Sequence, residues 1–139
     1  MTARELTAQP AGAAMARVLR SIMAVAALSL LVAAALHAGL VIPGPFDDAA
    51  TYETGVAVVL IMGLGLTFIG PAWARWGGLA ATTLALVGAS IGLYMALRGL
   101  GPNTLPDIVY HVALIGLLLA GIGVAWRGPS RRRPSSEGR

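Results

Sequence analysis

The stretch "SIMAVAALSLLVAAALHAGLVI", residues 21 to 42, runs for 22 residues, and His37 is the only ionisable side chain in it. A helix crosses the hydrocarbon core of a bilayer with about 20 predominantly apolar residues. The stretch is long enough to do so. It stops before Pro43 and Pro45, because proline lacks an N–H group and cannot continue a helix. We therefore expect a membrane-spanning helix over residues 21 to 42.

Three further apolar blocks of about spanning length follow, at residues 52–70, 76–97 and 108–126. The composition agrees with them, since 57% of the residues are hydrophobic and 12% are charged, against about 25% charged in soluble domains. The sequence therefore predicts an all-α integral membrane four-helix bundle.

The predicted membrane domain covers residues 20 to 127. Residues 1 to 19 and the basic tail from 128 to 139 lack apolar periodicity, and we expect both to be disordered on the cytoplasmic side.

Arginine placement predicts the orientation, because basic residues in short flanking segments stay in the cytoplasm. Arg98 lies on one side of the spans, and the other nine lie on the opposite side: Arg4, Arg17, Arg20, Arg75, Arg127, Arg131, Arg132, Arg133 and Arg139. We expect a multi-pass protein of the plasma membrane with both termini in the cytoplasm. The exclusive use of arginine over lysine is typical of a GC-rich bacterial genome. An alternative treats residues 1 to 38 as a secretory signal, but the apolar block exceeds a typical signal core.

The two outward hairpins share a pattern at an offset of 58 residues. Glu53 then matches His111, and the other matches are Tyr52 with Tyr110, Leu60 with Leu118, Gly63 with Gly121 and Gly65 with Gly123. With a shorter second loop, His37 matches Arg98. Two parallel helical-hairpin repeats would produce this pattern, but chance similarity between two apolar hairpins explains it more readily, and both interpretations stay open.

Ionisable residues near the membrane gather in the predicted outer layer of the bundle, and the inner halves of the spans carry none. Such groups are costly at membrane depth and usually face the bundle interior, which makes them candidates for a site. The candidate ligand-binding residues are His37, Glu53, Tyr94, Arg98 and His111. Asp107 is expected instead to cap the fourth span.

Three chemical interpretations fit these residues. His37, Glu53 and His111 form an accepted ligand set for a divalent metal. Together with Arg98 they could hold a quinone or a lipid headgroup, with histidine donating to a carbonyl and arginine binding an anion. The third interpretation is a structural ion pair of Glu53 with Arg98 or a histidine, with the tyrosines as interfacial aromatic residues.

Other function classes find no support in the sequence. There is no phosphate-binding loop, dinucleotide fingerprint or nucleophile elbow, and the arginines are topogenic, so nucleic acid is not an expected partner. The chain has no cysteine, which excludes disulfides and thiolate metal sites.

The segment "YETGVAVVLIMGLGL", residues 52 to 66, resembles the second helix of DoxX-like membrane proteins, with Glu53 at its start and Gly63 and Leu64 ten residues later. The resemblance implies a small subunit of quinone-linked or oxidative-stress-related membrane complexes. Glu53 is the residue that it carries over. The whole chain also resembles other small four-helix membrane proteins of high-GC bacteria.

The sequence thus predicts a small non-enzymatic membrane protein that acts as an accessory or interaction subunit and needs no cofactor. The alternative is a redox-associated subunit that binds quinone or metal through the outer His, Glu and Arg cluster. The expected partners are the lipid bilayer and either another membrane protein or a quinone.

Overall fold

The computed structural model describes residues 3–40 and 46–127, and side chains from residue 12 onward within that part. It contains four helices, α1 (Ala3–His37), α2 (Asp47–Leu66), α3 (Pro71–Leu97) and α4 (Leu105–Trp126), and no strand in the described ranges. Each has a segment long and apolar enough to cross a membrane, which in α1 is Gly12–His37. The predicted all-α four-helix bundle is confirmed.

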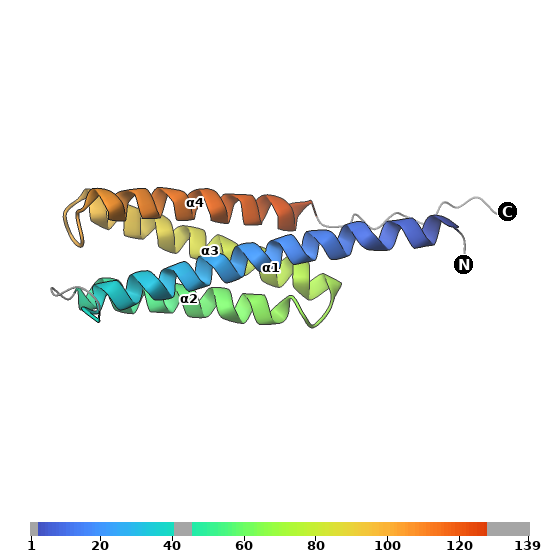
Figure 1. Cartoon of the computed structure of the whole chain (residues 1–139), viewed down its shortest axis with the longest axis horizontal. Coiled ribbons are helices and arrows are strands. Elements are labelled where there is room, and N and C mark those ends of the chain that lie inside the picture. Colours follow the sequence, from blue (N-terminus) through green and yellow to red (C-terminus); the bar gives the residue numbers. More distant parts are fainter. Residues whose placement is uncertain (1–2, 41–45, 128–139) are drawn as a thin grey trace.

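The helices follow one another around the bundle, with α1 packed on α2 and α4, and α3 packed on the same two neighbours. The pairs α1/α3 and α2/α4 are therefore the diagonals (Figure 1). The connections α1–α2 and α3–α4 lie at one end, which we call the distal end. The α2–α3 connection lies at the other, the terminal end, beyond which α1 extends (Figure 1).

The helix boundaries correct the sequence-based limits in two places. α1 begins at Ala3, although the sequence predicts disorder for residues 1 to 19, and the many alanines in this segment favour helix. α1 also ends at His37 instead of residue 42. Gly39 has a φ of +74° there, and the N–H of Leu40 bonds back to Ala35 O at 3.1 Å, which closes the helix in a Schellman motif. The predicted disorder of 128–139 lies outside the described residues.

Small residues let the backbones approach inside the bundle. Gly88 packs against Val56, and Gly63 of α2 packs against Ala81 of α3. Leu60 of α2 and Leu118 of α4 are fully buried in the core of the bundle. Lipid provides little hydrophobic drive between helices, so close packing of this kind holds the bundle together.

The two hairpins end their first helices in the same way. Gly99 has a φ of +68°, and Leu100 N bonds to Met95 O at 3.0 Å, as Leu40 does after α1. Superposing the two caps pairs His37 with Leu97, not with Arg98. The sequence-based pairing of His37 with Arg98 is therefore off by one residue. Glu53 of the first hairpin and His111 of the second are both buried, and they lie on the diagonal helices α2 and α4.

Candidate ligand cavity at the distal end of the bundle

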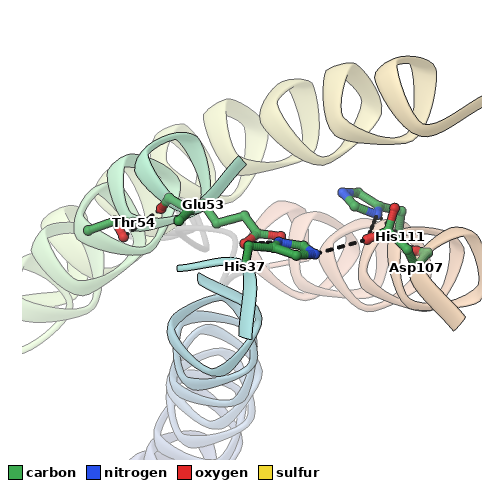
Figure 2. Close-up of polar contacts among 6 residues, drawn as sticks. His37, Glu53, Thr54, Asp107 and His111 are labelled. Carbon is green, nitrogen blue, oxygen red and sulfur yellow. Dashed lines mark hydrogen bonds and ion pairs between the residues drawn. The ribbon is translucent and has the colours of Figure 1, made fainter. Parts of the chain in front are cut away.

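Four polar side chains from three helices meet at the distal end. His37 Nδ1 on α1 lies 2.8 Å from Glu53 Oε2 on α2, and His37 Nε2 lies 3.8 Å from Asp107 Oδ1 on α4. His111, one turn further along α4, places Nδ1 3.5 Å from the same carboxylate oxygen. Figure 2 shows His37 between Glu53 on one side and the Asp107 and His111 pair on the other. We call these four residues the distal cluster.

The end of α1 sets the place of His37. It is the last residue of the helix, and α1 is the neighbour of both α2 and α4, which lie across the diagonal from each other. The His37 carbonyl accepts a hydrogen bond of 2.6 Å from the N–H of Phe46, and the two rings meet edge-on at 6.3 Å. These contacts hold the imidazole where it bridges the diagonal between Glu53 and Asp107.

The side chains of the distal cluster are largely buried. The side chains of Glu53, Asp107 and His111 are 5%, 7% and 8% exposed, and that of His37 is 15% exposed. Buried ionisable groups are stable only when they are hydrogen-bonded or paired. The close contact of His37 with Glu53 meets that need for both.

The hydrogen bonds define which atoms donate. His111 Nδ1 lies 2.9 Å from the carbonyl oxygen of Asp107, which can only accept, so this nitrogen carries the proton. His37 Nδ1 shares a hydrogen bond of 2.8 Å with Glu53 Oε2. Ionised carboxylates only accept hydrogen bonds, so Glu53 and Asp107 supply most of the acceptor atoms that the distal cluster presents.

A cavity of about 620 Å³ opens beside the cluster. All four cluster residues line it, and Asp47 and Asp48 lie at its exposed side, so four of the six acidic residues of the chain and both histidines surround one space. No arginine of the described ranges lines it. Its apolar wall includes Phe46, Tyr52, Ile91, Met95 and Leu100. The cavity thus combines an acceptor-rich polar side with an apolar side.

The structure brings together three of the five sequence-predicted site residues: His37, Glu53 and His111. Tyr94 and Arg98 lie elsewhere. The Arg98 guanidinium stacks on the Tyr94 ring at 5.7 Å, and both side chains are exposed outside the cavity. The structure therefore does not place Arg98 in this site as an anion-binding group, because Ala96 is the last buried residue of α3 and Arg98 lies two residues beyond it.

Asp107 is the member of the site that sequence reasoning missed. The sequence-based expectation makes it the cap of α4, but Thr104 is the N-cap, and its hydroxyl accepts from Asp107 N at 3.3 Å. With Thr104 as the cap, the Asp107 carboxylate is free to face His37. The sequence does contain a signal for Thr104 as the N-cap, since a threonine three residues before an acidic residue is typical of a helix start.

A metal centre finds no geometric support. In the described part of the chain no group of three or more His, Cys, Asp or Glu side chains is placed to hold a metal ion. The set His37, Glu53 and His111 fails because both Nδ1 atoms are engaged in hydrogen bonds and His111 Nε2 lies against Gly92 of α3.

These features define the class of the protein, a small multi-pass membrane protein with a polar cavity inside one end of a four-helix bundle. Comparison with protein-family models, with curated proteins and with solved structures gives no match. The resemblance to DoxX-like proteins therefore stays a prediction.

Proposed function

We propose that the protein binds a small amphiphile of the quinol class in the distal cavity and serves as an accessory subunit that holds this ligand in the membrane. The observation that carries the proposal is the convergence of His37, Glu53, Asp107 and His111 on one cavity that also has an apolar wall.

The acceptor-rich lining selects the chemistry of the ligand. A quinol offers hydroxyl groups that donate to carboxylate oxygens, whereas a quinone offers only acceptor carbonyls. Phe46, Tyr52 and Met95 supply apolar and aromatic surface for the ring. Ligand pockets commonly combine such a wall with a few polar groups and lie between the helices of bundles.

The proposal also includes a plasma-membrane location, cytoplasmic termini and a bacterial source. These three points rest on arginine placement and composition. In that orientation the distal cavity opens on the outer side of the membrane. The resemblance to DoxX-like proteins involves Glu53, a member of the same cluster.

Binding of a short-chain quinol to the purified full-length protein in detergent tests the proposal. We expect the quinol to bind at least about fivefold more tightly than its quinone, because one additional hydrogen bond contributes about 1 kcal/mol to the binding free energy. Glu53→Gln and His37→Ala should each weaken quinol binding. Thr54→Ala is the matched control, since Thr54 is exposed next to Glu53 and bonds back to Ala50 O at 2.7 Å (Figure 2).

Co-purification then tests the accessory role separately. The accessory role is supported if a second membrane protein co-purifies with the wild type and if its co-purification requires added quinol. If the quinol and the quinone bind equally, or if Thr54→Ala weakens binding as much as Glu53→Gln, the cluster is a structural ion pair and the proposal fails.

A further inference from the structure

A second cavity, of about 440 Å³, lies at the terminal end of the bundle, far along the helices from the distal cluster. It is bounded by α1, by the α2–α3 connection and by residues of α3 and α4. Arg20 and Arg75 line it, and none of the described residues in its lining is acidic. Its charge is therefore opposite to that of the distal cavity.

Arg20 is held at the wall of this terminal cavity. Its Nε donates to Thr67 Oγ1 at 3.0 Å, its Nη2 donates to the Thr67 carbonyl at 2.6 Å, and its guanidinium stacks on the Phe68 ring at 4.0 Å. All of these partners are neutral. The contacts orient the guanidinium without compensating its charge, and no carboxylate pairs with it in the described part of the chain.

Arg75 provides an independent observation. Its Nε atom is buried and has no hydrogen-bond partner among the described residues. A buried donor left without an acceptor is unfavourable by about 1–3 kcal/mol, and buried polar atoms of native proteins are rarely left so. An anion bound in the cavity that Arg75 lines would compensate the charge of its guanidinium group.

The start of α3 adds to the positive field. The helix begins at Pro71 after Gly70, both of which line the cavity, and no side chain of the described residues caps its first N–H groups. The first backbone N–H groups of a helix, together with its dipole, favour an anion. Two arginines and a helix start thus surround one space.

We propose that the terminal cavity binds an anionic phosphate group. Exposed Trp73, Trp76 and Trp126 lie at the same end of α3 and α4, and tryptophan favours the headgroup level of a membrane. The phosphate of an anionic phospholipid is therefore within reach, and free phosphate shares its chemistry. This inference stands apart from the proposed quinol site, because it involves neither its residues nor its charge.

Lipid binding to the full-length protein, measured by native mass spectrometry after release from detergent, tests the inference. In the wild type we expect phosphatidylglycerol to bind more tightly than phosphatidylcholine. Arg75→Gln should weaken phosphatidylglycerol binding about tenfold, as expected for one charge-assisted hydrogen bond. Arg98→Gln is the control, since Arg98 is an exposed arginine at the opposite end.

Competition with inorganic phosphate then identifies the source. Displacement of the lipid by millimolar phosphate indicates a site for free phosphate, and no displacement indicates a lipid headgroup; either result supports a phosphate site. Failure of the wild type to bind either phosphatidylglycerol or inorganic phosphate would overturn the inference, and this result does not depend on the folding of any variant. An equal loss in Arg98→Gln and Arg75→Gln would overturn it as well.

Discussion

Replacement of Gly92 by alanine tests the packing that shapes the distal cluster. A Cβ atom at Gly92 would overlap Nε2 of His111 and lie 2.8 Å from its Cδ2. The ring cannot simply swing aside, because its Nδ1 is hydrogen-bonded to Asp107 O at 2.9 Å. The added Cβ atom therefore both breaks this bond and pushes α3 away from α4.

The expected magnitude follows from three opposing terms. Alanine gains up to about 1 kcal/mol over glycine inside a helix. Loss of the His111 hydrogen bond costs about 1 kcal/mol, and overpacking of a buried site costs about 1–3 kcal/mol. We therefore expect Gly92→Ala to lower the free energy of unfolding by roughly 1–3 kcal/mol.

Gly116→Ala is the matched control for this substitution. Gly116 lies inside α4 and is exposed, and a Cβ atom added there would meet nothing within 4 Å, so the gain in helix propensity is not opposed. Unfolding of the purified protein by sodium dodecyl sulfate should show Gly116→Ala at or above the wild type and Gly92→Ala below it. Equal stability of the two variants would refute the contact between His111 and α3.

Three further outcomes are expected. Leu60→Ala, at a fully buried position, should reduce stability by about 2–5 kcal/mol, while Met62→Ala, at a position 67% exposed, should change little in the same unfolding assay. Thr104→Ala removes the N-cap of α4 and should cost about 1 kcal/mol; no loss would mean that the cap contributes nothing. Because the chain has no cysteine, Asn103→Cys should react with an impermeant maleimide on intact cells and Ile69→Cys should not, and the reverse pattern would invert the proposed orientation.

The number and type of elements could be predicted because hydrophobic length is a one-dimensional property. A block such as residues 108–126 is long enough to cross a bilayer whatever it packs against. Helix ends were less predictable. Gly39 and Gly99 stop α1 and α3 through a left-handed backbone conformation, and the apolar residues that follow Gly39 concealed the first stop.

The candidate site could be predicted only in part, because the sequence shows the depth of a residue along a span but not the direction in which its side chain points. His37, Glu53 and His111 could be grouped by depth, since depth follows from position along a span. Which side chains face inward depends on the rotation of each helix, and one residue changes that direction by about 100°. Arg98 was included for its depth and points outward, whereas Asp107 was assigned to a cap that Thr104 provides.

The most direct test of the central claim is to map where the quinol binds. The full-length protein would be irradiated with a photoreactive azido derivative of a short-chain quinol and the cross-linked residues identified by mass spectrometry. We predict cross-links to residues that line the distal cavity, such as Phe46, Tyr52 and Met95, which excess unlabelled quinol suppresses. Cross-links spread over the lipid-facing helix surfaces, or confined to the terminal cavity, would contradict a quinol site at His37 and Glu53.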